Sequence, residues 1–161
     1  MFKIRKSTKD DLPEILTLYQ HAREEMKKNN NPHQWKDTEP RVENVIADIS
    51  NGNHHILEKD GVICGAFSMF FGEDPTYAYI EGKWLNDLPY ITIHKLASNN
   101  LHKGVLKAII DYAFCFLNTV RIDTHEQNTI MRHLLDKYGF TLCGTIYLLN
   151  EEPRLAYQKT I

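Results

Sequence analysis

Residues 90–105 read Tyr90-Ile-Thr-Ile-His-Lys-Leu-Ala97, Ser98-Asn99-Asn100 and Leu101-His102-Lys103-Gly104-Val105. The first segment predicts a strand, the second a polar turn, and the third the start of a helix from about Lys103 to Leu117. Unpaired amides at the start of such a helix form a site for an anion, and His102, Lys103 and Lys107 add positive charge there. A diphosphate would suit this turn. An ordinary strand-to-helix connection fits the same spacing.

The chain after this helix alternates strand and helix, which predicts a locally parallel sheet covered by helices. We expect a strand at Val120–Thr124, a helix from about Asn128 to Tyr138, and a strand at Thr141–Leu149. Residues Arg154–Lys159 are a candidate for one more strand at the edge of the sheet.

The chain before residue 90 predicts strands and two helices. Ser7 and Thr8, with Asp10 and Asp11 three residues later, are the side chains that typically start a helix. Lys59-Asp60-Gly61 separates two β-rich runs and predicts an antiparallel hairpin. The expected elements are a strand at Phe2–Lys6, helices at Leu12–Met26 and Val42–Ile49, hairpin strands at His54–Glu58 and Val62–Phe71, and a further strand at Tyr77–Ile80.

Composition narrows the class of protein. The 161 residues, 42% hydrophobic and 25% charged, are typical of one globular domain. The formal charge of -2 provides no overall field for a polyanion, so nucleic acid is not expected as a partner.

No apolar run approaches the roughly 20 residues that span a bilayer, and no apolar segment follows the charged N-terminus, so we expect a cytoplasmic protein without membrane contact. Cys64, Cys115 and Cys143 stand in apolar settings, which predicts reduced core thiols, with a redox or nucleophilic role as the alternative. They lack the spacing of metal ligands, so no metal site is expected.

The C-terminal half resembles a known family. Arg121-Ile-Asp-Thr-His-Glu-Gln-Asn128, followed by Met131-Arg-His-Leu-Leu-Asp-Lys-Tyr-Gly-Phe140, is similar to the strand, asparagine and Gly-Phe helix of the GNAT N-acetyltransferase superfamily. The order of the expected elements is similar over nearly the whole chain, and residues 31–35, 72–76, 84–87 and 93–98 resemble a bacterial branch of mostly unassigned substrate. The resemblance implies an α/β GNAT acyl-CoA N-acyltransferase fold, with a mixed central β-sheet flanked by helices, as a single domain over residues 1–161. It also implies acetyl-CoA as the cosubstrate.

The same resemblance implies where acetyl-CoA binds. The strands ending at Ala97 and Thr124 are expected to splay apart around the pantetheine arm, with backbone groups near Leu96 polarising the thioester carbonyl. The family's diphosphate loop aligns on Gly104, the one position of its pattern that matches. The expected cofactor-binding residues are Leu96, Ala97, Ser98, Leu101, His102, Lys103, Gly104, Val105, Leu106, Lys107, Asn128 and Met131.

Direct attack of an amine on the thioester requires a base and a proton for the departing thiolate. His94, expected on the same face of its strand as Thr92 and Leu96, lies near the position of the catalytic His or Glu of several relatives and titrates in the useful range. A half-buried structural histidine is the alternative. Glu81 and His125 are further catalytic candidates, for which solvated or capping roles are the alternative.

The sequence does not identify the residue that protonates the thiolate, because Leu135 occupies the position where many relatives have a tyrosine. Water, an unprotonated but stabilised thiolate, or Tyr147 could take its place. Aromatic residues in the loops around the expected acceptor cleft suit a cationic amine, although core packing explains them as well. The candidates for substrate binding are Trp35, Trp84 and Tyr90.

We therefore predict an N-acetyltransferase that moves an acetyl group from acetyl-CoA to a primary amine, on a small molecule or a peptide, in a ternary complex. A non-catalytic acyl-CoA-binding regulatory module with the same fold is the alternative, and it fits the departures at Leu101, Leu106 and Leu135. An interaction protein without a ligand is the third hypothesis. A homodimer through the sheet edge near Arg154–Lys159 is a further hypothesis.

Overall fold

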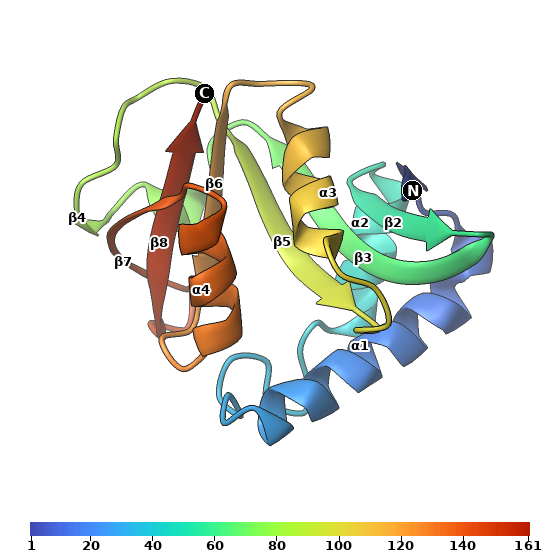
Figure 1. The fold of residues 1–161 in the computed structure, drawn as a ribbon. Helices are drawn as coiled ribbons and strands as arrows, with labels where there is room; N and C mark the ends of the chain where they lie inside the picture. Colours follow the sequence, from blue (N-terminus) through green and yellow to red (C-terminus); the bar gives the residue numbers. More distant parts are fainter.

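In a computed structural model that describes residues 1–161, one eight-stranded sheet runs through the whole molecule, with helices on both faces (Figure 1). The strands lie in the order β1-β2-β3-β5-β6-β8-β7-β4. Their bounds are β1 Lys3–Lys6, β2 His54–Lys59, β3 Val62–Phe71, β4 Glu81–Gly82, β5 Ile91–Ser98, β6 Thr119–Thr124, β7 Thr141–Tyr147 and β8 Pro153–Thr160. The α-helices are α1 Leu12–Lys28, α2 Val42–Ser50, α3 Val105–Ala113 and α4 Thr129–Lys137.

The first half forms as the sequence predicts. The expected helix start is a capping box, in which the Asp11 carboxylate accepts from the Thr8 amide at 2.8 Å. The β2–β3 hairpin turns at Asp60 and Gly61, whose φ angles of 53° and 78° are both positive. Positive φ at both central residues is typical of a two-residue turn whose twist matches that of the strands.

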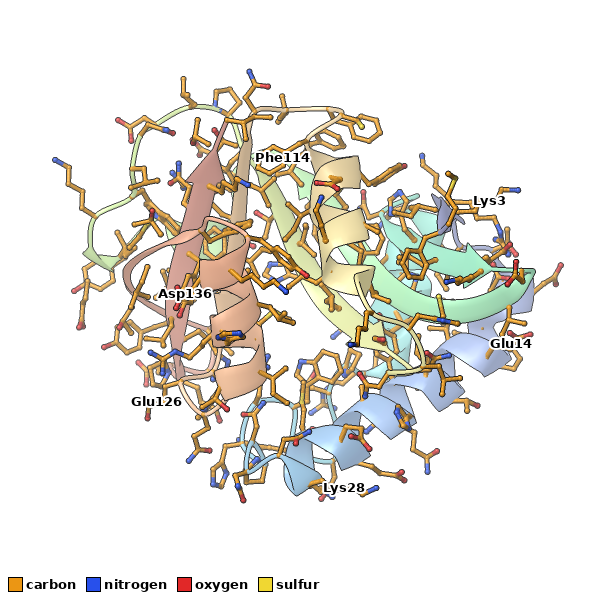
Figure 2. All side chains as sticks on the ribbon, viewed as in Figure 1. Lys3, Glu14, Lys28, Phe114, Glu126 and Asp136 are labelled. Carbon is orange, nitrogen blue, oxygen red and sulfur yellow. The ribbon has the colours of Figure 1, made fainter.

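The sheet separates two apolar layers. α3 and α4 cover one face over the larger cluster, which includes Ile91, Ile93 and Ile109, while α1 and α2 cover the other over a cluster that includes Ile15 and Ile56. Charged side chains project outward from the helices (Figure 2). Of the three free thiols, only Cys64 is buried; Cys115 is exposed and Cys143 half-buried, so the expected core location is wrong for Cys115. None of the helices is long and apolar enough to span a bilayer.

β5 and β6 are the one parallel pair of the sheet, and they separate early. Their register contains two pairs, Ile91 with Val120 and Thr92 with Arg121, although β5 continues to Ser98 and β6 to Thr124. Beyond Thr92 the strands splay apart, as expected, and their backbones no longer bond to each other. α1 crosses the molecule at the end where the strands are separated (Figure 1).

Two expected strands differ from the structure. Residues 77–80 are not a strand, because Asp74 Oδ1 accepts from the Thr76 amide at 2.9 Å and caps a 3-10 turn, η2, over Pro75–Tyr77. Residues Arg154–Lys159 do form a strand, but β8 pairs with β6 on one side and β7 on the other, so it is not an edge. The free edges are β1 and β4. The edge invoked for a homodimer is therefore not available.

Candidate functional site

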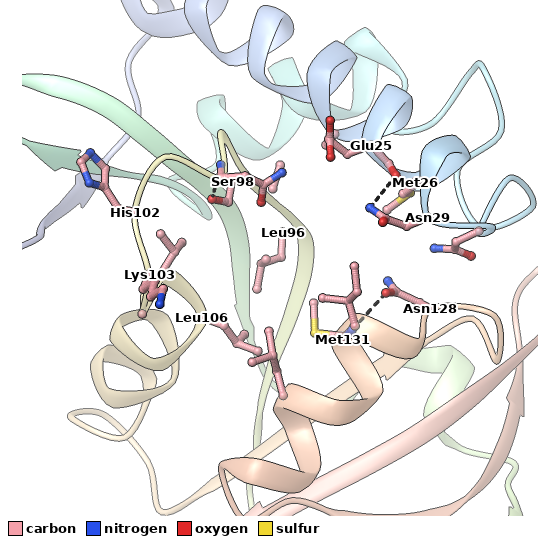
Figure 3. Close-up of a pocket in the computed structure, with 18 of the residues that line it drawn as sticks. Glu25, Met26, Asn29, Leu96, Ser98, His102, Lys103, Leu106, Asn128 and Met131 are labelled. Atoms are coloured by element: carbon pink, nitrogen blue, oxygen red, sulfur yellow. Dashed lines mark hydrogen bonds between the residues drawn. The ribbon is translucent and has the colours of Figure 1, made fainter.

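A cavity of about 500 Å³ lies where β5 and β6 have separated. Its walls come from the end of β5, the turn before α3, one side of α4 and the C-terminal half of α1 (Figure 3). The volume falls in the range of small-molecule and cofactor sites, roughly 300–1,000 Å³. Ten of the expected cofactor-binding residues line it: Leu96, Ala97, Ser98, His102, Lys103, Gly104, Val105, Leu106, Asn128 and Met131.

Two expected cofactor-binding residues lie elsewhere. The Leu101 side chain is 76% exposed and lines a separate groove beside α1. Lys107 lies on the exposed side of α3, where its ammonium group contacts Asp111 at 2.6 Å. Neither side chain lines the cavity, so both assignments are corrected.

The turn before α3 provides the positive end of the cavity. Gly104 has φ +84° and ψ 12°, and a Cβ placed on it would have no neighbour within 4 Å. The first amides of a helix have no partner within it and carry the positive end of its dipole. His102, Lys103 and Lys137 also line the cavity. Leu106, where the family's small residue is expected, points largely into the core, with 5% exposure. Helix amides, two lysines and a histidine therefore meet at this end of the cavity.

A bulge interrupts β5 beside the cavity. Ala97 pairs with Ala66 and His94 with Ser68, so that Lys95 and Leu96 together face one residue of β3. Lys95 has a φ of 52°, in the left-handed region. Because of the extra residue, Leu96 packs against the α3–α4 cluster while Ala97 joins the α1–α2 cluster. The expectation that Leu96 shares a face with His94 is therefore wrong.

His94 is held between two carboxylates on the α1–α2 face of the sheet. Its Nε2 lies 2.8 Å from Asp74 Oδ2, and its Nδ1 lies 3.8 Å from Asp123 Oδ2, which accepts from the Tyr77 hydroxyl at 2.6 Å. Burial opposes ionisation of Asp74, but hydrogen bonds from His94 and Thr76 outweigh it and lower the pKa of Asp74 to about 2. An ionised carboxylate only accepts, so Nε2 carries the proton and Nδ1 of the neutral ring keeps its lone pair.

The other catalytic candidates have different surroundings. Glu81 accepts from the Tyr147 hydroxyl at 2.8 Å on β4, which β6, β8 and β7 separate from β5. His125 Nδ1 accepts from the Gln127 amide at 3.0 Å, a turn-capping contact, and burial together with Arg154 lowers its pKa. None of the three candidates lines the cavity itself, and His94 is the one that lies between two carboxylates.

Two of the three aromatic candidates already hold a cation of the chain itself. The Arg121 guanidinium lies 4.0 Å from the centre of the Trp84 ring and 4.1 Å from that of Tyr90, and Arg121 is 5% exposed. It also donates to Gln158 Oε1 at 3.2 Å. Trp84 and Tyr90 therefore pack around Arg121 rather than lining an acceptor cleft, which corrects their assignment. Trp35 stays partly exposed, edge-on to Tyr19 at 5.7 Å.

The loop between α1 and α2 closes one end of the cavity, a feature that the sequence did not predict. Gln34 Oε1 accepts from Asn128 Nδ2 at 3.0 Å, Thr124 Oγ1 at 3.2 Å and Asn31 Nδ2 at 3.1 Å. Asn128 Oδ1 also accepts from the Met131 amide at 3.1 Å and caps α4. Asn31 is 2% exposed, lines the cavity and has no partner for its Oδ1. It is therefore an acceptor available to a ligand.

The mixed sheet opens between two parallel strands, and the turn after the first of them leads into a helix; acetyltransferases of known structure share this fold. A GNAT-family acetyltransferase from Streptococcus agalactiae has 32% identity, with 99% of this chain and 95% of that chain covered and a TM-score of 0.87. The chain therefore belongs to the GNAT family of acetyltransferases and is an acyltransferase.

More distant structures share the fold. A GNAT-family acetyltransferase from Listeria monocytogenes has 20% identity and a TM-score of 0.71, with 99% of this chain and 95% of that chain covered. A ribosomal-protein-alanine N-acetyltransferase from Brucella melitensis has 23% identity and a TM-score of 0.62, with 99% of each chain covered. No protein-family model and no curated protein matches the sequence.

Proposed function

We propose that residues 1–161 form a single N-acetyltransferase domain that moves the acetyl group of acetyl-CoA to a primary amine by direct attack. The observation that carries this proposal is the cavity, in which the β5 bulge residue Leu96, the start of α3 and one side of α4 face a common space. Membership of the GNAT family supports acetyl transfer in general. The cosubstrate, the acceptor class and the residue roles are the proposed part.

The lining residues fit acetyl-CoA. The α3 amides with Lys103 and Lys137 would hold the diphosphate, since backbone donors and positive charge meet there. The apolar side chains of Leu96, Met131 and Leu134 would contact the pantetheine arm. The open space at Gly104 permits close approach of a phosphate to the backbone. When bound, acetyl-CoA supplies the electrophilic carbonyl carbon and the thiolate leaving group.

His94 would act as the general base. Its Nδ1 lone pair accepts the proton that the amine loses, while Asp74 holds Nε2–H and stabilises the imidazolium. Asp123, 3.8 Å from Nδ1, stabilises the same charge. A positioned base contributes about 10²- to 10⁴-fold to a rate. The Leu96 amide, on the bulge, would polarise the thioester carbonyl.

Tyr147, the tyrosine that the sequence offered as a replacement, does not supply the missing acid. Leu135 is fully buried in the core, and the Tyr147 hydroxyl bonds to Glu81 at the far side of the sheet. We assign protonation of the thiolate to water, and its stabilisation to the second Nδ2–H of Asn128, since Gln34 takes the first.

Thiol release from acetyl-CoA with a panel of primary amines tests the proposal. Small polyamines, aromatic amines and peptide N-termini, each added to purified protein, cover the acceptor classes. We expect at least one amine to accelerate thiol release and to be recovered with an added acetyl group. Tight binding of acetyl-CoA with no transfer to any amine would contradict the proposal and favour the regulatory alternative.

A further inference from the structure

A chain of three buried side chains ends on the bulge of β5, on the side covered by α1. The Tyr19 hydroxyl donates to the Lys95 carbonyl oxygen at 2.7 Å and lies 2.8 Å from His54 Nε2. His54 Nδ1 lies 2.7 Å from Ser7 Oγ. All three side chains are buried, and the mechanism proposed above does not use them.

Only one placement of the protons satisfies the three hydrogen bonds of Tyr19, His54 and Ser7. A carbonyl oxygen only accepts, so the single Tyr19 proton belongs to the bond with Lys95. The Tyr19 oxygen must then accept from His54 Nε2–H, which leaves His54 Nδ1 to accept from the Ser7 hydroxyl. Burial lowers the pKa of His54 to about 4 and raises the pKa of Tyr19, so both stay neutral at pH 7.

The peptide between Lys95 and Leu96 is the group that this chain orients. In a trans peptide the C=O and N–H bonds point in opposite directions. With the Lys95 carbonyl held toward α1 by Tyr19, the Leu96 N–H points away from α1, and the Leu96 side chain lines the cavity. The bulge separates this peptide from regular pairing with β3, and a φ of 52° at Lys95 is sparsely populated for residues with a Cβ. Such a conformation persists only where its surroundings hold it.

We infer that Tyr19 is a positioning residue, which fixes the Leu96 N–H as the donor to the thioester carbonyl of a bound acyl-CoA, and that His54 and Ser7 fix Tyr19 in turn. This inference rests on the proposed function. The ligand class is an acyl thioester rather than CoA in general, because the oriented donor requires a carbonyl oxygen.

Packing alone is the competing explanation, since Tyr19 also contacts Trp35. Tyr19→Phe keeps the ring and removes the hydroxyl. Tyr157→Phe is the matched control, because the buried Tyr157 hydroxyl accepts from Arg132 Nε at 3.3 Å and lies outside the proposed machinery. Both variants lose one buried hydroxyl, but only the first releases the Lys95 carbonyl.

The test compares the binding of acetyl-CoA with that of S-ethyl-CoA, a thioether that lacks the carbonyl, by calorimetry. For the wild type we expect acetyl-CoA to bind about five- to tenfold more tightly, the value of one net hydrogen bond. In Tyr19→Phe this ratio should fall to within about twofold, with the affinity for S-ethyl-CoA unchanged, whereas Tyr157→Phe should keep the wild-type ratio. Ser7→Ala, which removes the outermost bond alone, should lower the ratio less.

An unchanged ratio in Tyr19→Phe would overturn the inference, and so would a wild type that binds both ligands equally. In the second case thiol release with an amine would still support the proposed function. Failure of both ligands to bind would instead remove the proposed function and the inference together. If Tyr19→Phe does not fold, the Ser7→Ala ratio decides the question.

Discussion

Gly104 offers a sharp test of the proposed diphosphate end of the cavity. Its φ of +84° lies in the left-handed region, while a Cβ would meet nothing within 4 Å. Gly104→Ala and Gly104→Glu therefore share one backbone penalty of about 1–2 kcal/mol in the free energy of unfolding. For a chain of this size, that lowers the melting temperature by about 2–8 °C in both variants. They differ in the charge that the glutamate adds.

The charge difference sets the expected effect on binding. A carboxylate about 6 Å from one diphosphate charge repels it by about 0.7 kcal/mol in bulk water and about 3 kcal/mol at an effective dielectric constant of 20. Calorimetry at low salt should therefore show acetyl-CoA binding about 3- to 100-fold more weakly to Gly104→Glu than to Gly104→Ala. Added salt should reduce this difference by screening. Equal affinities of the two variants would refute the placement of the diphosphate at this turn.

The remaining predictions concern the base and the buried polar groups. His94→Ala should lower kcat at pH 7 by about 10²- to 10⁴-fold and leave acetyl-CoA binding nearly unchanged; wild-type turnover would reduce His94 to a structural residue. Asp74→Asn should lower kcat in the same direction, because the ring loses its fixed tautomer, and an unchanged pH–rate profile would contradict that role. Since burial lowers the pKa of His54 to about 4, the unfolded chain binds the extra proton between about pH 6.5 and 4. The free energy of unfolding should therefore fall by up to about 3 kcal/mol as the pH drops through this window. Urea unfolding at pH 7 and at pH 4.5 measures this fall, and equal free energies at the two pH values would contradict the prediction. Arg121→Ala should destabilise the fold by about 3–5 kcal/mol in urea, because it removes the cation between the Trp84 and Tyr90 rings and the donor to the Asn86 carbonyl; a loss below about 1 kcal/mol would contradict this.

Much of the fold could be predicted because its signals are local. The capping box of Thr8 and Asp11 needs four consecutive residues, and the hairpin at Asp60 and Gly61 needs two. Residues 77–80 were misassigned because their alternating aromatic pattern resembles a strand, while the competing signal, the Asp74 cap, lies just outside it. The place of β8 between β6 and β7 depends on long-range pairing that no local pattern encodes.

The candidate site also has parts that the sequence predicts and parts that it does not. Of its backbone parts, the turn at Gly104 follows from the order of strand, turn and helix, whereas the opening after Thr92 was implied by the resemblance to the family. The partners of His94 do not, because Asp74 and Asp123 are brought to it from two other segments of the chain by the fold. The bulge at Lys95 could not be predicted either, because one extra residue reverses the side-chain alternation of the strand without changing its composition.

The aromatic signal shows how a correct chemical inference can identify the wrong ligand. Trp84 and Tyr90 do favour a cation, as their ring faces predict, but that cation is the guanidinium of Arg121. Because Arg121 comes from a strand more than 30 residues later in the sequence, spacing alone could not pair them. The proposed acceptor amine would therefore have to be recognised by groups other than these two rings.

The central claim is that the cavity between β5 and β6 binds acetyl-CoA, and a calorimetric titration of the wild-type protein tests it most directly. We predict one site per chain with a Kd in the micromolar range, and a weaker affinity in Gly104→Glu than in Gly104→Ala. No heat of binding up to millimolar acetyl-CoA, from a protein that melts cooperatively, would contradict the claim.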